Sequence, residues 1–401
     1  MMNSLAGPQN QQQLTAGVQF GKYEVISKLA SGGMAELFLA KMNFLGVAKK
    51  VVLKHILPHL AENADFIQMF LDEARVTAQL SHPNIVQIHE VGQYANIFYI
   101  AMEYIRGQNL RAFRKRLNRF PEYRQNPPYA LLASIFAQLA AGLHYAHTAV
   151  DDMGRPLNII HRDVSPNNLL ISYNGHVKIV DFGVAKASTQ QHQTQAGNVK
   201  GRLSYMSPEQ ITEKPLTPRS DVFSLGVVLY EITTGKRLFK RKSEAGTIQA
   251  VMHSDVEPPS SLQANYPPRL EEIVMKTLQR EPEERFHTAE DMRMALEQFT
   301  LEEGGLSGTR QIAELMDILF EEEKGSDFTG THSRADLQLL AHRTGAFEEF
   351  ARSGSGPSPL PPGSYPGHHG QPGSGSGSLG HLHGHGTSGS MPGYGHMGMG
   401  G

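Results

Sequence analysis

The chain has 401 residues, a formal net charge of −2 and no cysteine. The near-zero charge argues against nucleic-acid binding as the main function, and the lack of cysteine excludes disulfides, thiolate nucleophiles and cysteine-based metal sites. The polar, glutamine-rich N-terminus lacks the basic and apolar regions of a signal peptide, so we expect a cytoplasmic protein.

Composition divides the chain into four regions. Residues 1–20 predict a disordered arm, 21–299 have a globular pattern, 300–350 are acidic and partly helical, and 351–401 are rich in Gly, Ser, Pro and His. The last region has almost no residues that could bury a core, so we expect it to be disordered. Any metal binding by its histidines is expected to be weak and incidental.

Short runs rich in Val, Ile, Leu and aromatic residues predict strands in the first part of the globular region. They lie at 22–30, 35–43, 48–56, 85–92 and 97–105. Residues 64–80 between them have apolar side chains at helical spacing. After Gly107 the pattern predicts long helices, with a short β insert at 168–172 and 177–181.

One stretch has the length of a membrane span. Residues 129–150 contain no Asp, Glu, Lys or Arg. Ser134, Gln138, His144 and His147 interrupt the stretch, whereas membrane spans are predominantly apolar throughout. We therefore predict a buried core helix and no membrane span.

A segment between the first two strands is a candidate phosphate-binding loop. Residues with little or no side chain let backbone N–H groups approach phosphate oxygens. The alternative is a plain hairpin turn. The segment "LASGGMAEL" consists of Leu29, Ala30, Ser31, Gly32, Gly33, Met34, Ala35, Glu36 and Leu37.

Two later motifs place polar residues beside apolar runs. "HRDVSPNN" contains Asp163 and Asn168, and "VDFG" places Asp181 eighteen residues after Asp163. Carboxylate and amide oxygens are hard ligands of the kind that Mg²⁺ prefers. Taken singly, the first motif also fits a polar turn and the second a simple hairpin.

Together these motifs resemble the Hanks-type serine/threonine protein kinases, in the form found in bacteria, over residues 23 to about 295. The resemblance implies an α+β, bilobal protein-kinase fold with a β-rich N-lobe at 21–104 and a helical C-lobe at 108–299. It implies an enzyme that uses ATP and Mg²⁺ to phosphorylate Ser or Thr of protein substrates, and also itself, in bacterial signalling.

The resemblance also implies how ATP is bound. Lys54 would hold the α- and β-phosphates and pair with Glu73, with Asp72 as the alternative partner. The phosphate loop keeps only the middle glycine of the family pattern. Met102 would be the gatekeeper, and backbone groups from Glu103 to Ile105 would bind adenine.

For phosphoryl transfer, the resemblance makes Asp163 the residue that receives or orients the acceptor hydroxyl, while Asn168 and Asp181 bind Mg²⁺. Two positions depart from the family pattern. Ser165 stands where a lysine usually contacts the γ-phosphate, and Arg202 stands where a threonine is usual. We expect Arg202 either to supply the missing cation or to face solvent or an acidic substrate residue.

Further matches concern the scaffold and its regulation. Asp221 would hold the backbone of the catalytic loop, and Glu209 would form a buried ion pair with Arg285. Arg162 would bind a phosphate on the segment 184–200. The residues considered there are Ser188, Thr189, Thr194 and, as a second cation, Lys186.

Residues 310–323 place Ile312, Leu315, Met316 and Leu319 on one helical face. We expect this helix to dock on the C-lobe or on a protein partner. The alternatives to an active kinase are a nucleotide-binding pseudokinase that acts as a scaffold and a kinase of small molecules. Tyrosine as the acceptor also stays open, because Ser165 and Arg202 alter the residues that mark Ser/Thr preference.

Overall fold

The structure is a computed structural model that describes residues 14–31, 35–44, 46–57, 60–182, 202–305 and 308–325. Residues 1–13 of the predicted arm, the segment 183–201 and the tail from 326 onward lie outside the described residues. The predictions for Lys186, Ser188, Thr189, Thr194 and the histidine-rich region therefore stay predictions.

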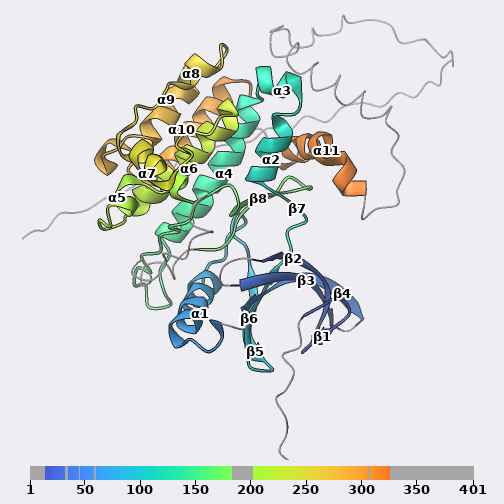
Figure 1. Ribbon diagram of the computed structural model, residues 1–401. Helices are drawn as coiled ribbons and strands as arrows, with labels where there is room; N and C mark the ends of the chain where they lie inside the picture. Colours follow the sequence, from blue (N-terminus) through green and yellow to red (C-terminus); the bar gives the residue numbers. More distant parts are fainter. Residues whose placement is uncertain are drawn as a thin grey trace, which may run out of the picture. The chain divides into compact units, whose positions relative to one another are not determined.

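The N-lobe is an antiparallel six-stranded sheet with the order β1-β2-β3-β4-β6-β5 (Figure 1). Its strands are β1 (Gln19–Phe20), β2 (Tyr23–Ser31), β3 (Ala35–Phe44), β4 (Val47–Ile56), β5 (Ile88–Tyr94) and β6 (Ile97–Glu103). Helix α1 (Ala64–Ala78) starts at Asn63, whose side chain caps the first turn. Phe70 and Ala74 of α1 belong to one buried cluster with Ile100 of the sheet. This packing holds α1 against the sheet.

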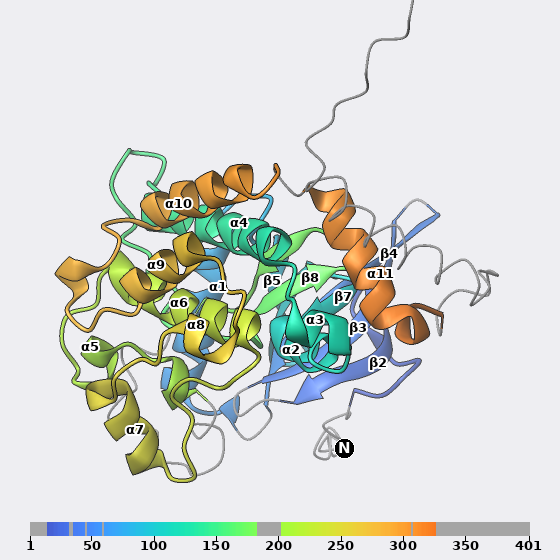
Figure 2. The ribbon, with the colours of Figure 1, turned by 90° about the horizontal axis from the view of Figure 1, so that it is seen from above.

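The C-lobe is built around two buried helices, α4 and α6. Its helices are α2 (Leu110–Leu117), α3 (Pro121–Gln125), α4 (Tyr129–His147), α5 (Pro208–Ile211), α6 (Pro218–Thr234), α7 (Glu244–His253), α8 (Pro259–Leu262), α9 (Pro268–Thr277), α10 (Ala289–Glu302) and α11 (Thr309–Gly325), with 3₁₀ turns η4 (Leu203–Tyr205) and η5 (Pro282–Glu284). Figure 2 shows α10 lying along α4, with α11 beside α2. The predicted bilobal kinase fold is confirmed.

Helix α4 is the apolar stretch that has the length of a membrane span. It is the one helix of the described part that is long and apolar enough for such a span, and 67% of its apolar window is buried inside the protein. Leu132, Phe136, Leu139 and Leu143 are fully buried in the core of the C-lobe. The prediction of a core helix is therefore confirmed.

A small three-stranded sheet positions the polar motifs. It has the order β7-β8-β9, with β7 (Gly107–Asn109), β8 (Leu169–Ser172) and β9 (Val177–Ile179). Leu169 pairs with Ile179 in antiparallel register. Because Asn168 precedes β8 and Asp181 follows β9, this register brings both residues to the same end of the hairpin.

The predicted helix at 310–323 is observed as α11, and it docks on the C-lobe. Ile312, Leu315, Met316 and Leu319 are at most 4% exposed. The helix contacts α2, α4 and β8, and Gly175 in the turn between β8 and β9 lies directly under its first turn. The apolar face is therefore covered by this chain itself.

Candidate active site

Lys54 of β4 is the centre of a charged cluster that joins both lobes. Its Nζ lies 2.6 Å from Glu73 Oε1 in α1 and 3.0 Å from Asp181 Oδ1 beyond β9. Asp72, the alternative partner, lies on the outer side of α1, where it binds Gln68 and Arg75. The helical period separates the two neighbouring carboxylates, so that only Glu73 faces the sheet.

The carboxylates keep the Lys54 ammonium charged. Burial alone would lower the pKa of Lys54, but the nearby charges of Asp181 and Glu73 and their hydrogen bonds outweigh burial and raise this pKa above its ordinary value. A permanently charged, oriented ammonium group is what binding of the α- and β-phosphates of a nucleotide requires.

Asp221 of α6 holds the backbone of the catalytic loop. Its carboxylate accepts hydrogen bonds from the backbone N–H groups of His161 at 2.7 Å and Arg162 at 2.9 Å. His147 Nε2 lies 2.8 Å from the same carboxylate. Burial would raise the pKa of Asp221, but the His147 bond and the charges of His147 and His161 lower it. The carboxylate is thus ionised and fixes Arg162 in a left-handed conformation, with φ of 64°.

Asp163 lies between Asn168 and Arg202. The Asn168 amide nitrogen donates to Asp163 Oδ2 at 3.0 Å and to the Asp163 carbonyl at 2.9 Å. Arg202 Nη1 lies 3.6 Å from the same Oδ2, and the Arg202 side chain is 47% exposed. Ser165 is buried. The structure therefore places the Arg202 cation beside the catalytic-loop carboxylate.

Asn168 and Asp181 fit an Mg²⁺ site. The Val180 N–H donates to the Asn168 carbonyl at 2.9 Å, which sets Asn168 opposite the residue before Asp181. The Asn168 amide uses its nitrogen on Asp163, so its side-chain oxygen is the group that would bind a metal. Two protein ligands suffice, because Mg²⁺ keeps several waters and binds substrate phosphates. Asp181 has φ of 56°, and neighbouring Phe182 is fully buried against His161.

The segment after β6 provides the candidate adenine contacts. Met102 is buried at the end of the sheet. The Glu103 N–H donates to the Gln87 carbonyl at 2.9 Å. This N–H is therefore committed to the sheet, which leaves the Glu103 carbonyl and the Ile105 backbone as the candidates for adenine.

The candidate phosphate loop is described only at its two ends. Ser31 pairs with Glu36 where β2 meets β3, so the segment connects two paired strands, as its predicted position between the first two strands requires. Glu36 is bound by Lys28 at 2.5 Å and lies 3.3 Å from His55. The other described loop residues are Leu29, Ala30, Ala35 and Leu37, while Gly32, Gly33 and Met34 lie outside the described residues.

Glu209 and Arg285 form the predicted buried ion pair. Two hydrogen bonds of 2.7 and 2.9 Å join the guanidinium to the carboxylate, and both residues are at most 5% exposed. Burial would raise the pKa of Glu209, but the Arg285 hydrogen bonds and charge lower it. The pair ties the segment that begins at Arg202 to the connection between η5 and α10.

Two structural residues were missed by the motif analysis. His147 was considered only as a polar interruption of an apolar helix, yet it supports Asp221. Glu231 of α6 is fully buried and binds both Arg114 and Arg237. A charged residue inside the apolar run "SLGVVLYEITTG" was the available signal, because a buried carboxylate needs a cationic partner.

Comparison with known proteins agrees with this geometry. The protein kinase domain family matches residues 23–296. The chain is 40% identical over 341 residues to the tyrosine-protein kinase MasK of Myxococcus xanthus, covering 85% of this chain and 51% of that protein. It is 34% identical over 274 residues to the serine/threonine-protein kinase PrkC of Bacillus subtilis, covering 68% of this chain and 39% of that protein.

A solved structure shows the same fold. The crystal structure of the Mycobacterium tuberculosis PknI kinase domain aligns with a TM-score of 0.52 and 25% sequence identity, covering 71% of this chain and 99% of that one. The present chain spans only about half the length of the first curated relative. The matched residues include the Lys54–Glu73–Asp181 cluster and the catalytic loop, and the chain therefore belongs to the protein kinase domain family, among the bacterial Hanks-type serine/threonine protein kinases.

Proposed function

We propose that this protein transfers the γ-phosphate of ATP to hydroxyl groups of protein substrates, chiefly Ser and Thr, and that it phosphorylates itself. The observation that carries the proposal is the Lys54 ammonium held by Glu73 at 2.6 Å and Asp181 at 3.0 Å. A cation fixed between a helix of one lobe and the metal-binding residue of the other is the arrangement that phosphoryl transfer requires.

The roles of the residues follow from their chemistry. Lys54 would orient the α- and β-phosphates, and Asn168 with Asp181 would hold Mg²⁺, which neutralises charge on the phosphates when bound. Asp163 would orient the acceptor hydroxyl and receive its proton as oxygen attacks phosphorus in line and ADP departs. Arg202, 3.6 Å from Asp163, would supply the positive charge that Ser165 lacks.

Radiolabelled ATP tests the proposal on the purified full chain. Incorporation of label into the protein itself and into added protein substrates is expected, with loss of at least about 100-fold for Asp163→Asn. A pseudokinase would retain Mg-ATP but incorporate no more label than Asp163→Asn. Transfer of label to a small molecule, without any labelled protein, would instead support a kinase of small molecules.

Tyrosine is a second candidate acceptor. The observation that favours it is the 40% identity to a relative named as a tyrosine-protein kinase, together with Ser165 and Arg202 at positions that depart from the serine/threonine pattern. Acid hydrolysis of the labelled protein followed by phosphoamino-acid separation distinguishes the two. We expect phosphoserine and phosphothreonine, and predominant phosphotyrosine would reverse the assignment.

We also propose that the protein acts in the cytoplasm, as part of a signalling pathway. The support is chemical, since ATP is an intracellular substrate and a chain without cysteine suits a reducing compartment. Fractionation of cells followed by detection of the protein tests this location, and recovery in the membrane fraction would contradict it.

A further inference from the structure

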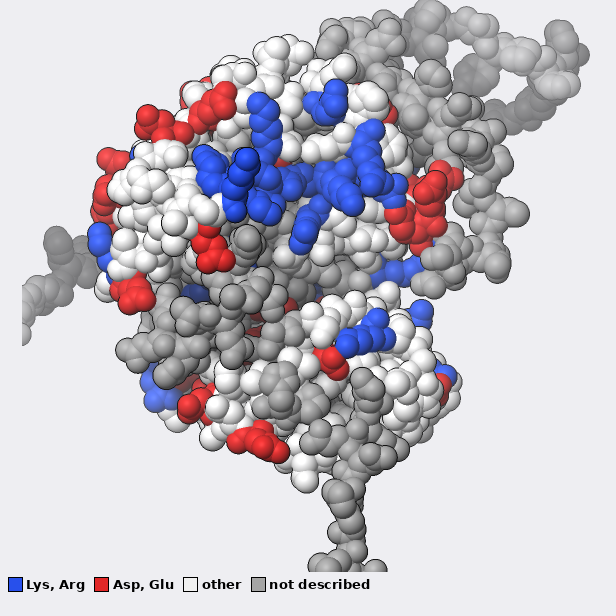
Figure 3. Space-filling view, in the orientation of Figure 1, with Lys and Arg blue, Asp and Glu red and all other residues white. Residues whose placement is uncertain are grey.

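Two segments of the C-lobe are unusually rich in positive charge. Residues 111–119, "RAFRKRLNR", run along α2, and residues 236–242, "KRLFKRK", connect α6 to α7. Each segment carries five Lys or Arg and no Asp or Glu. In Figure 3 basic side chains form a band across this face of the C-lobe. We call the two segments together the basic surface.

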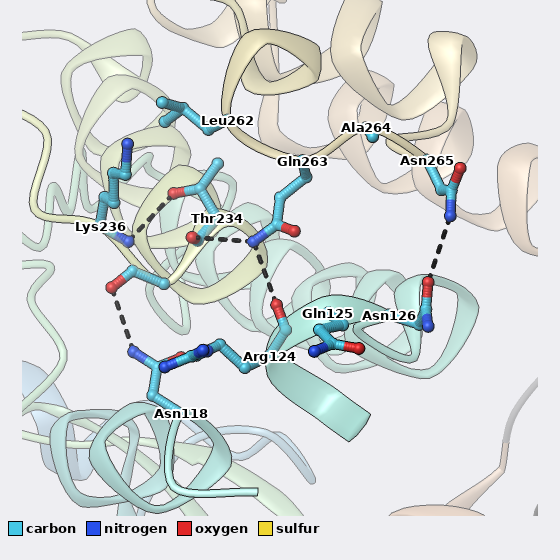
Figure 4. Close-up of a pocket in the computed structure, with 11 residues that line it drawn as sticks. Asn118, Arg124, Gln125, Asn126, Thr234, Lys236, Leu262, Gln263, Ala264 and Asn265 are labelled. Atoms are coloured by element: carbon cyan, nitrogen blue, oxygen red, sulfur yellow. Dashed lines mark hydrogen bonds between the residues drawn. The ribbon is translucent and has the colours of Figure 1, made fainter. Parts of the chain in front are cut away.

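Specific contacts hold the two segments side by side. Arg114 and Arg237 bind opposite oxygens of the same buried carboxylate, Glu231, at 3.1 and 2.9 Å. The Asn118 amide donates to the Gly235 carbonyl at 3.1 Å, and a hollow of about 580 Å³ lies beside this contact (Figure 4). Shared buried partners make the basic surface a fixed feature of the fold.

Most of the positive charge on this surface is not neutralised within the protein. Glu231 serves two arginines, and Glu323 of α11 binds Arg116. Within the described ranges, the remaining cations are exposed and form no ion pair. These cations are Arg111, Lys115, Arg119, Lys236, Lys240, Arg241 and Lys242.

One part of this surface is hollowed. A depression of about 710 Å³ is lined by Arg237, Lys240, Arg241 and Lys242, with Glu244 as its carboxylate. Because Arg237 is paired with Glu231, one carboxylate and three cations without an ion pair in the described part of the chain line the hollow, and this excess of positive charge favours an anionic ligand. The depression is large enough to take in several side chains of a bound segment.

Hydrogen bonds connect one basic segment to the catalytic loop and the other to the segment that begins at Arg202. The Arg111 N–H donates to the carbonyl of Pro166, three residues after Asp163. Arg237 donates to Ser204 Oγ at 3.1 Å, and Ser204 is two residues from Arg202. These contacts place the two basic segments beside the loops around Asp163, and a peptide whose hydroxyl lies at Asp163 advances about 3.3 Å per extended residue away from it.

We propose that the basic surface binds acidic side chains that flank the acceptor residue, so that the protein selects acidic substrate segments. The proposal rests on the proposed kinase function. A peptide is favoured over a nucleic acid because the surface is continuous with the residues around Asp163 and because the chain as a whole has a net charge of −2.

Paired peptides test the substrate preference. Each contains one threonine in an Ala/Gly frame, flanked on both sides by Glu in one peptide and by Gln in the other. We expect the full chain to favour the Glu peptide in kcat/KM by at least about tenfold at low salt, with a smaller ratio at high salt because exposed charges are screened. Equal kcat/KM for the two peptides, with normal autophosphorylation, would overturn this inference but leave the proposed function intact.

Two charge-removing variants locate the effect. An exposed ion pair contributes at most roughly fivefold, so Lys240→Ala/Lys242→Ala is expected to lower kcat/KM for the Glu peptide by roughly two- to 25-fold. Arg111→Ala/Lys115→Ala should act similarly. The matched control, Lys49→Ala/Lys50→Ala, removes two exposed lysines of β4 and should retain the preference. An equal loss in the control would contradict the assignment.

A binding measurement makes the test independent of catalysis. Fluorescence anisotropy of the labelled Glu peptide with Asp163→Asn protein is expected to show binding that Lys240→Ala/Lys242→Ala weakens. Should neither the chain nor any peptide be phosphorylated, the proposed function fails while this measurement still decides the surface. Tighter binding of a DNA oligonucleotide than of the Glu peptide at the same salt would overturn the peptide assignment in favour of nucleic acid.

Discussion

Lys54 is the residue on which nucleotide chemistry most directly depends. Its ammonium joins Glu73 to Asp181, and a methionine of similar length would keep the packing while removing the charge. Lys54→Met is expected to lower the rate of phosphoryl transfer by about 100- to 1,000-fold, the usual effect of losing one preorganised electrostatic partner. Initial rates with radiolabelled ATP check this, with Lys49→Met as the control. A loss under about tenfold would contradict the role of Lys54.

Arg202 allows a sharper test, because its role is specific to this chain. If its guanidinium, 3.6 Å from Asp163, offsets the charge that Ser165 does not carry, Arg202→Ala should lower kcat by more than about threefold. Arg202→Lys should recover part of the loss, because an ammonium retains the charge without the bidentate geometry. Should kcat for Arg202→Ala stay within about threefold of the parent, Arg202 does not act as the compensating cation.

For single residues, the sequence motifs indicated the positions of the main candidate site residues but not all the groups that these residues contact. Lys54 lies within β4, Asp163 lies in the loop before β8, and Asp181 follows β9, and the motif order implied these places because the apolar runs of the strands are visible in the sequence. The choice of Glu73 over Asp72 needed the orientation of α1. The partners of His147 and Glu231 were missed because Asp221 and Arg114 lie 74 and 117 residues away from them in the sequence.

Helix α11 docks on the C-lobe through a close contact with Gly175. A Cβ on Gly175 would lie 1.9 Å from the Thr309 carbonyl oxygen at the start of α11, and Gly175 has φ of +80°. Gly175→Ala is therefore expected to lower the midpoint of urea unfolding and to loosen α11. Gly154 has a similar φ of +77° with nothing within 4 Å, so Gly154→Ala carries backbone strain alone, about 1–2 kcal/mol.

The two alanine variants separate the effect of backbone strain from the effect of the steric clash with α11. Hydrogen exchange of residues 309–325 is expected to rise in Gly175→Ala and to match the parent in Gly154→Ala, because only the former collides with α11. Equal stability and equal exchange in the two variants would show that α11 adjusts to the added methyl group without cost.

The element types were largely predictable, because strands and long helices have strong apolar periods. The helix at 310–323 was predicted from its apolar face, but its binding surface was not. An apolar helical face indicates that the helix is buried on that side, but not against which surface. The contacts of α11 with Gly175, α2 and β8 show that this surface is the C-lobe and not a partner.

Across the molecule, Glu209 and Arg285 couple stability to pH. The pKa of Glu209 in the folded protein is below its ordinary value of 4.5. A carboxylate with a depressed folded pKa stabilises the protein above its unfolded pKa, and this contribution is lost as pH falls through the folded pKa. Stability from this pair is thus complete near neutral pH and declines below about pH 4.5.

Glu209→Gln isolates this contribution. At neutral pH the variant should be less stable by about 3–5 kcal/mol, because Arg285 stays buried without its anion. Since the parent alone loses the contribution in acid, the difference between parent and variant should narrow below pH 4.5. Urea unfolding of both proteins from pH 7 to pH 3 measures it, and a difference that stays constant would argue against the assigned pKa shift.

The contact of Lys54 with Glu73 has a pharmacological consequence. A competitive inhibitor that requires α1 to swing outward would first separate the Lys54 ammonium from Glu73, which removes one of the two carboxylates that compensate the burial of Lys54. Compounds that bind without moving α1 leave the ion pair between Lys54 and Glu73 intact and avoid this loss of free energy. Inhibitors that bind beside α1 in its observed position are therefore expected to act at lower concentrations than inhibitors that displace α1.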